Sequence, residues 1–103
     1  MSTEPTGAIK VIVEFQAKPG KRVELKSLLE SVLAKYGPGQ PGYLGSARYE
    51  VLDNPNMLIE VADWASVEVR AAAIQEVMAA GAYAPLADLL AAPVRATVIR
   101  QLP

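Results

Sequence analysis

The feature that most constrains the fold is a hairpin pattern between Gly42 and Trp64. Two runs with alternating side chains, Tyr43 to Leu52 and Met57 to Trp64, flank the segment Asp53 to Asn56. Alternation with a period of two is typical of a strand whose two faces have different surroundings, and Asp, Asn and Pro are frequent in turns. The stretch therefore predicts two adjacent antiparallel strands, which the rest of the chain must cover and extend.

The remaining segments supply two more strands and the helices. Apolar residues recur every second residue in some segments and about every 3.6 residues in others. The first spacing is typical of strands and the second of amphipathic helices. The expected elements are a strand at Ala8–Ala17, a helix at Arg22–Tyr36, a helix from the N-cap Ser66 to near Gly81, a short helix within Tyr83–Ala92 and a strand at Val94–Leu102. This order predicts an α+β fold, a ferredoxin-like β-α-β-β-α-β sandwich with both helices on one face of an antiparallel sheet.

The length of 103 residues fits one domain, which we expect over residues 8–103 after a disordered tail at residues 1–7. The chain lacks an apolar run of about 18 residues, so we expect no membrane span. The polar N-terminus has neither the basic nor the apolar region of a signal peptide. We therefore expect a cytoplasmic protein.

Missing residue types narrow the possible chemistry. The chain has no cysteine and no histidine, which excludes thiol catalysis, Ser-His catalysis and metal ligation by thiolate or imidazole. We expect no metal and no cofactor, and acid–base chemistry has to come from carboxylates, tyrosine, lysine or water. A net charge of −1 gives no electrostatic basis for binding nucleic acid or an anionic membrane.

The hairpin contains one carboxylate that does not fit its expected surroundings. If Asp53–Asn56 is a four-residue loop, Leu52 faces Met57, and Glu60 lies opposite Tyr49 on the face that the helices cover. Burial there would raise the pKa of Glu60, and Tyr49 could share a hydrogen bond with it. Glu60 is then either a general acid or base in a pocket, or a hydrated or ion-paired side chain without a catalytic role. A bulge would invert the assignment of faces.

The opposite face of the predicted sheet mixes charged and apolar side chains. Ile12, Leu44, Leu52, Ile59 and Val61 lie among Lys10, Glu14, Arg48, Glu50 and Asp63. An open sheet face with this many apolar residues is usually covered. We therefore expect a homodimer that forms through this face.

The order of elements and several motifs resemble the antibiotic biosynthesis monooxygenases, a family of dimeric α/β barrels. The matching residues are Lys18-Pro19-Gly20-Lys21, Gln40-Pro41-Gly42-Tyr43-Leu44-Gly45, Ile59 to Trp64 followed by Ala65-Ser66, and Tyr83-Ala84-Pro85-Leu86-Ala87. The resemblance extends from Ile9 to Leu102. It implies a cofactor-independent monooxygenase that holds a small aromatic substrate, such as a phenol, quinol or polyketide, in a cavity between sheet and helices.

The resemblance also implies the residues of the site, with two departures from the family. Trp64 corresponds to the pocket tryptophan, whereas Ala73 stands where many members have a histidine. Val13 stands where the haem-degrading branch has an asparagine, so haem degradation is disfavoured. The expected catalytic residues are Glu60 as the base and Tyr49 as its hydrogen-bond partner, and the expected binding residues are Trp64, Val13, Phe15, Ala73 and Met78. A non-catalytic ligand-binding or structural homodimer, and an isomerase or cyclase, remain as alternatives.

Overall fold

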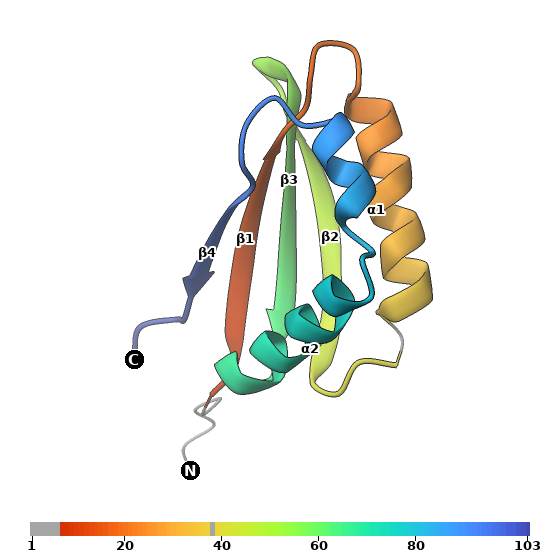
Figure 1. Cartoon of the computed structure of the whole chain (residues 1–103). Helices are drawn as coiled ribbons and strands as arrows, with labels where there is room; N and C mark the ends of the chain where they lie inside the picture. Colours follow the sequence, from red (N-terminus) through yellow and green to blue (C-terminus); the bar gives the residue numbers. More distant parts are fainter. Residues whose placement is uncertain (1–6, 38) are drawn as a thin grey trace.

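The computed structural model describes residues 7–37 and 39–103, and within them a four-stranded antiparallel sheet carries its helices on one face (Figure 1). The order along the sheet is β2-β3-β1-β4. The elements are β1 (Ile9–Gln16), α1 (Arg22–Tyr36), β2 (Tyr43–Val51), β3 (Asn54–Trp64), α2 (Val67–Ala79), the short 3-10 helix η1 (Ala84–Asp88) and β4 (Arg95–Ile99). This arrangement confirms the predicted ferredoxin-like α+β fold.

The boundaries of several elements follow from local chemistry. Helix α1 has the predicted bounds. The side chain of Ser66 caps α2 as predicted, because its hydroxyl accepts a hydrogen bond of 3.2 Å from the backbone N–H of Val69. Pro85 lies in the first turn of η1, where its missing N–H costs no helical hydrogen bond. Of the predicted disordered tail, only Gly7 lies within the described residues.

The core is divided into two clusters on the helix-covered face of the sheet. One cluster packs α1 and η1 against one end of β1 and β3, and it contains Phe15, Ala17, Leu25, Leu29, Leu58 and Leu86. The other packs α2 against the opposite end and contains Ile9, Val11, Ala62, Trp64 and Ala73. Val13 contacts both clusters and pairs with Glu60 across the β1–β3 ladder. The centre of this face is therefore where a polar residue interrupts the core.

The predicted register of the hairpin is wrong by one residue. Strand β3 begins at Asn54 after a tight turn at Leu52 and Asp53, and the ladder is irregular between Glu50 and Val51 and between Tyr43 and Gly45. As a result Glu60 pairs with Arg48, while Tyr49 pairs with Ile59 on the other face. Glu60 and Trp64 lie on the helix side of the sheet as predicted. Tyr49 instead lies on the face without helices, and Arg48 and Glu50 lie on the helix side.

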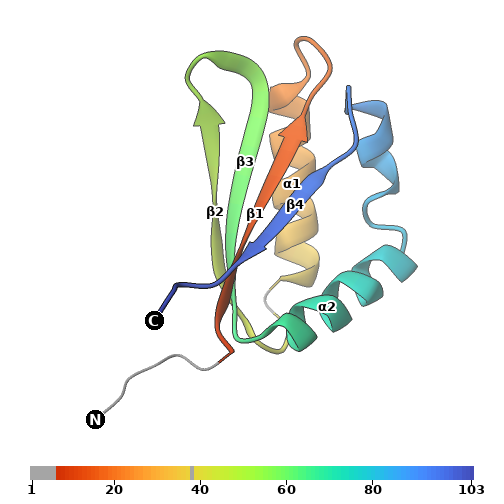
Figure 2. The same cartoon turned by 90° about the vertical axis from the view of Figure 1, so that its left-hand side faces the viewer.

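The other face of the sheet carries no helix of the described chain (Figure 2). Leu44 and Tyr49 are exposed there, and every residue of β4 is exposed. Lys10 and Asp63, which pair across β1 and β3, form an ion pair of 2.6 Å on this face. Within the described residues, no helix combines the length and apolar character that crossing a membrane requires.

Candidate active site

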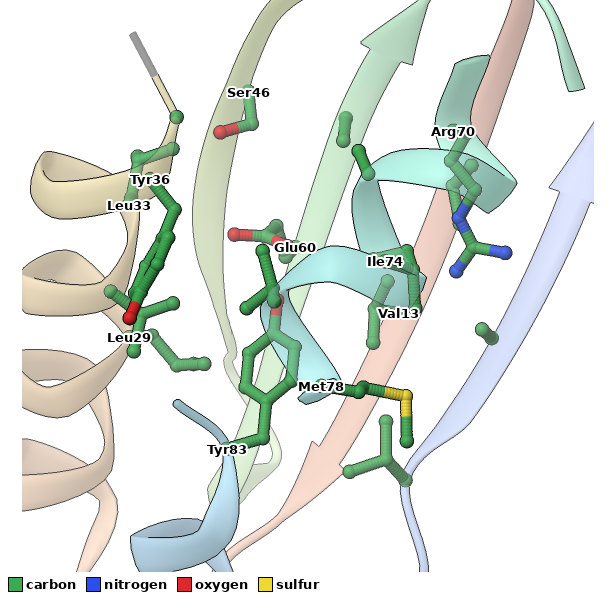
Figure 3. Close-up of a pocket in the computed structure, with 18 of the residues that line it drawn as sticks. Val13, Leu29, Leu33, Tyr36, Ser46, Glu60, Arg70, Ile74, Met78 and Tyr83 are labelled. Atoms are coloured by element: carbon green, nitrogen blue, oxygen red, sulfur yellow. The ribbon is translucent and has the colours of Figure 1, made fainter. Parts of the chain in front are cut away.

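A cavity of about 430 Å³ lies between the helices and the sheet. It opens at the boundary between the two core clusters, with α1 on one side and α2 and η1 on the other (Figure 3). Its volume falls within the range of roughly 300–1,000 Å³ that is typical of small-molecule sites. Apolar and aromatic side chains make up most of its wall, including Val13, Phe15, Leu29, Trp64, Ile74 and Leu86.

Glu60 projects from the middle of β3 into this cavity (Figure 3). On the same face of β3 its neighbours are the buried residues Leu58 and Ala62, so a carboxylate occupies a position that the pattern would give to an apolar side chain. Burial raises the pKa of Glu60 above its ordinary value of 4.5, and the charge and hydrogen bond of Arg48 oppose this rise. Glu60 is thus a stronger base than a solvated carboxylate.

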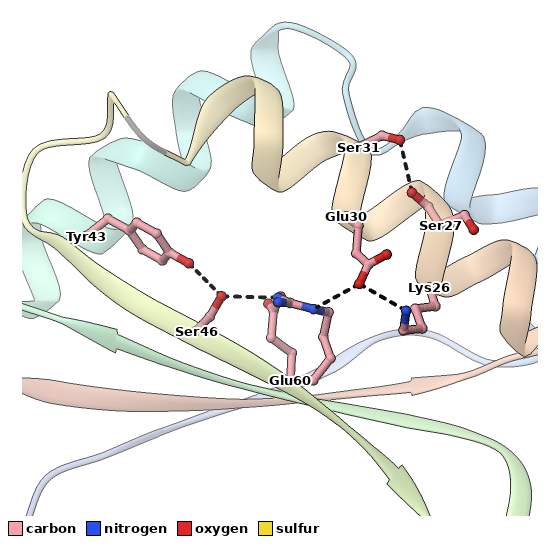
Figure 4. Close-up of polar contacts among 8 residues, drawn as sticks. Lys26, Ser27, Glu30, Ser31, Tyr43, Ser46 and Glu60 are labelled. Carbon is pink, nitrogen blue, oxygen red and sulfur yellow. Dashed lines mark hydrogen bonds and ion pairs between the residues drawn. The ribbon is translucent and has the colours of Figure 1, made fainter.

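Arg48 joins Glu60 to a line of polar contacts that leads from the cavity to the surface of α1 (Figure 4). Its Nη1 lies 3.3 Å from Glu60 Oε2 and 3.2 Å from Ser46 Oγ, and its Nε lies 4.0 Å from Glu30 Oε2. Ser46 also bonds the hydroxyl of Tyr43. The side chains of Arg48 and Glu60 are 17% and 21% exposed. The guanidinium is therefore held beside Glu60 by partners on both sides.

Tyr83, just before η1, directs its hydroxyl toward Glu60 (Figure 3). Burial raises the pKa of Tyr83 above its ordinary value of 10.0, the charge of Glu60 raises it further, and Arg70 on α2 partly offsets both. Tyr83 consequently stays protonated at neutral pH and can donate a hydrogen bond. A base and a protonated donor thus face the same space, an arrangement suited to removing a proton and stabilising the resulting oxyanion.

Most of the residues predicted for the site line the cavity. Trp64, which is 7% exposed, lies at its wall with the ring of Tyr43 in edge contact at a centroid distance of 5.2 Å. The other predicted binding residues in the lining are Val13, Phe15, Ala73 and Met78. Tyr49 does not line it, because the register places this residue on the opposite face with 54% of its surface exposed. The predicted Tyr49–Glu60 hydrogen bond is therefore wrong, and Arg48 is the partner.

Sequence reasoning missed four polar residues of the site. The sequence pattern predicts Arg48 on the wrong face, and it does not single out Ser46, Tyr83 or Arg70 as site residues. A signal was present for the first two, since a glycine inside a strand pattern, here Gly45, often marks a bulge. The backbone of Gly45 has a φ of 131°, and the irregularity of the ladder lies at this residue.

The sheet order and the helix-covered cavity define a fold class, that of the antibiotic biosynthesis monooxygenase structures. The similar solved structures include a candidate monooxygenase of this kind from Bordetella bronchiseptica, with a TM-score of 0.80, 16% identity and coverage of 94% of this chain and 99% of that chain. SnoaB from Streptomyces nogalater, a cofactor-independent oxygenase, has a TM-score of 0.79 at 15% identity, covering 94% and 95% of the two chains. A conserved protein from Methanosarcina mazei Go1 has a TM-score of 0.82 at 21% identity, covering 95% and 96%. No protein-family model and no curated protein matches the sequence.

Proposed function

We propose that this protein is a cofactor-independent monooxygenase that oxidises a small phenol, quinol or polyketide-like aromatic in the cavity. The observation that carries the proposal is the position of Glu60, a carboxylate of raised pKa in the middle of an aromatic-lined cavity, with the hydroxyl of Tyr83 directed toward it. A strengthened base beside a protonated donor is the equipment needed to form a substrate anion. The structural likeness to a cofactor-independent oxygenase supports this reaction class.

In the proposed reaction the substrate supplies the electrons. Glu60 removes a proton from the phenol or from the activated ring carbon, and Tyr83 donates a hydrogen bond to the oxygen on which negative charge accumulates. The anion then reduces O₂, the oxidant. When a ring CH₂ becomes C=O, one oxygen atom forms the carbonyl, and the other leaves as water with the two methylene hydrogens.

Oxygen uptake with anthrone as the probe tests this proposal. Wild-type protein is expected to consume O₂ with anthrone, and Glu60→Gln to do so at least about a hundredfold more slowly, because general acid–base catalysis contributes roughly 10²–10⁴-fold. Glu50→Gln is the matched control. Glu50 is also a carboxylate on the helix side of the sheet, it pairs with Arg22 at 3.8 Å, and it is not part of the cavity wall.

Uptake by Glu60→Gln at the wild-type rate would contradict the assignment of the base. Anthrone binding by the wild type without any uptake of O₂ would contradict the oxygenase and favour a ligand-binding protein. Turnover of a substrate under anaerobic conditions would favour an isomerase or cyclase, since proton transfer between Glu60 and a ligand needs no oxidant.

We also propose that two copies of the chain pair through the open face of the sheet. Leu44 and Tyr49 are exposed on β2, and the half-buried Ile12, Ile59 and Val61 lie on the same side of the molecule without a covering helix among the described elements. A contiguous apolar sheet face of this kind is expected to be covered by a partner. A second copy offers the same face, as a twofold dimer requires.

A further inference from the structure

The cavity wall contains two charged side chains among the described residues, Glu60 and Arg70, and they differ in how their charges are balanced. Glu60 is neutralised by Arg48 at 3.3 Å. Arg70 takes part in none of the ion pairs or side-chain hydrogen bonds found among residues 7–37 and 39–103. The described part of the cavity therefore has an excess of positive charge at Arg70.

Arg70 and Glu60 reach the cavity from opposite layers of the fold. Arg70 extends from the N-terminal half of α2, and Glu60 extends from β3 (Figure 3). The charge of Arg70 is felt inside the cavity, since it counteracts the larger effects of burial and of Glu60 on the pKa of the Tyr83 hydroxyl. The hydroxyl of Tyr83 is thus influenced by a carboxylate and by a guanidinium. A ligand that spans the cavity meets a base and a cation at separate positions.

The cavity wall also concentrates aromatic side chains. The chain has six aromatic residues, of which all but Tyr49 line the cavity, namely Phe15, Tyr36, Tyr43, Trp64 and Tyr83. Aromatic rings prefer offset or edge-to-face contacts with other rings, and these contacts favour a flat aromatic ligand over a flexible aliphatic one.

We infer that the site binds a hydroxylated aromatic carboxylate, with the ligand carboxylate on Arg70 and its hydroxyl directed toward Glu60 and Tyr83. The inference rests on the proposed function in so far as the same cavity and the same Glu60 are used. It specifies the substrate class further, because a neutral phenol would leave the guanidinium of Arg70 without an anionic partner.

The physical basis is the geometry and hydration of arginine. A guanidinium presents two parallel N–H groups that match the two oxygens of a carboxylate, and it loses less on dehydration than a lysine ammonium. A hydrogen bond between charged groups contributes more than a neutral one, and more again where apolar walls reduce the local dielectric constant. The contribution of the ligand carboxylate to the binding affinity therefore comes mainly from Arg70. Substitution of this one side chain should remove that contribution.

The test compares 6-hydroxy-2-naphthoate with 2-naphthol, which lacks only the carboxylate, by calorimetric titration of the full chain in oxygen-free buffer at neutral pH. Wild-type protein is expected to bind the naphthoate at least about tenfold more tightly than the naphthol. Arg70→Gln should lose this preference while its affinity for 2-naphthol stays the same, and Arg70→Lys should retain part of it. Octanoate, an aliphatic carboxylate, should bind more weakly than the naphthoate.

Arg100→Gln is the matched control, since it removes one positive charge from an exposed position outside the cavity wall. It should preserve the preference for the carboxylate. Equal affinity of the wild type for naphthoate and naphthol, or a preference that survives in Arg70→Gln, would overturn the inference. Octanoate binding as tight as naphthoate binding would overturn the aromatic class. Because binding is measured without O₂, the result does not depend on whether Glu60 supports oxidation.

Discussion

Glu60 shows how one residue can define a site within an otherwise apolar core. Its neighbours on the same face of β3, Leu58 and Ala62, belong to the two separate core clusters, and the cavity opens where Glu60 stands between them. Desolvation raises the pKa of the carboxyl group, while Arg48 opposes the rise. The balance between these two effects keeps Glu60 a strengthened base that can still ionise.

Arg48 is therefore expected to set the pH dependence of the reaction. Glu60 acts as a base only when ionised, so activity should rise with pH through its raised pKa. Arg48→Met removes the charge that lowers this pKa, and the acidic limb of the profile of kcat against pH should move to higher pH. Activity at neutral pH should fall by roughly tenfold, a typical loss for one charge-assisted hydrogen bond.

Glu30→Gln serves as the control for this prediction. It removes the outer partner of Arg48, at 4.0 Å, and leaves the contact of Arg48 with Glu60 in place. Its acidic limb should not move to higher pH. A profile of Arg48→Met that superimposes on the wild-type profile would show that Arg48 does not control the ionisation of Glu60.

The sequence pattern could predict Glu60 and Trp64 at this site but not the partner of Glu60. Both residues lie on β3, whose alternation from Leu58 to Trp64 is regular, and their face follows from the buried neighbours. The partner depends on the register with β2, where a shift of one residue replaces Tyr49 by Arg48. The contribution of Tyr83 depends on how η1 packs over the sheet, which local periodicity does not encode.

At the level of elements, two irregularities in the hairpin decide which side chains face the cavity. Near the turn β3 contains extra residues, and near its start β2 places Tyr43 and Leu44 opposite Trp64. The second irregularity restores Tyr43 to the same face as Ser46 and Arg48. Apolar periodicity predicted the type and order of every element, and the bounds of α1, because these depend on local patterns. The bulges depend on packing between strands, so apolar periodicity along one strand could not predict them.

Gly42, which directly precedes β2, packs closely against α2 and is expected to be sensitive to substitution. It has a φ of 77°, and a Cβ placed there would lie 2.9 Å from Val69 Cβ on α2. Gly42→Ala should therefore lower the free energy of unfolding by about 1–3 kcal/mol, from backbone strain and from displacement of α2. Urea denaturation with circular dichroism measures this change.

Gly39→Ala provides the comparison, because a Cβ at Gly39 would meet no atom within 4 Å and its backbone does not adopt a left-handed conformation. Its stability should change by no more than about 0.5 kcal/mol. Equal stability of Gly42→Ala and wild type would mean that the packing of α2 does not require a residue without a side chain at position 42.

On the scale of the whole molecule, the sheet separates two surfaces with different properties. The helix side contains both core clusters and the cavity, and the open side exposes apolar residues of β2 and β4. In this proposal the open side pairs with a second copy, while the helix side binds the ligand. The two proposals can therefore be tested independently by substitutions on opposite faces of one sheet.

Light scattering in solution tests the proposed pairing. The wild-type mass should be twice the 11.0 kDa of one chain. Tyr49→Asp, which places a charge among the apolar residues of the open face, on the edge strand β2, should give the mass of one chain. Val23→Asp changes an apolar residue on α1 that is more exposed than Tyr49, at 74% against 54%, and should leave the mass unchanged. A wild-type mass of one chain would contradict the pairing.

The most direct test of the central proposal is the fate of ¹⁸O₂ during oxidation of anthrone by dialysed, chelator-treated protein. If Glu60 starts an oxidation in which the substrate supplies the electrons, mass spectrometry should find one ¹⁸O atom in the quinone formed by the wild type and the other in water. Glu60→Gln should form at least about a hundredfold less labelled quinone in the same time. Labelled quinone formed equally fast by Glu60→Gln, or no labelled quinone above the protein-free rate with the wild type, would contradict the proposal.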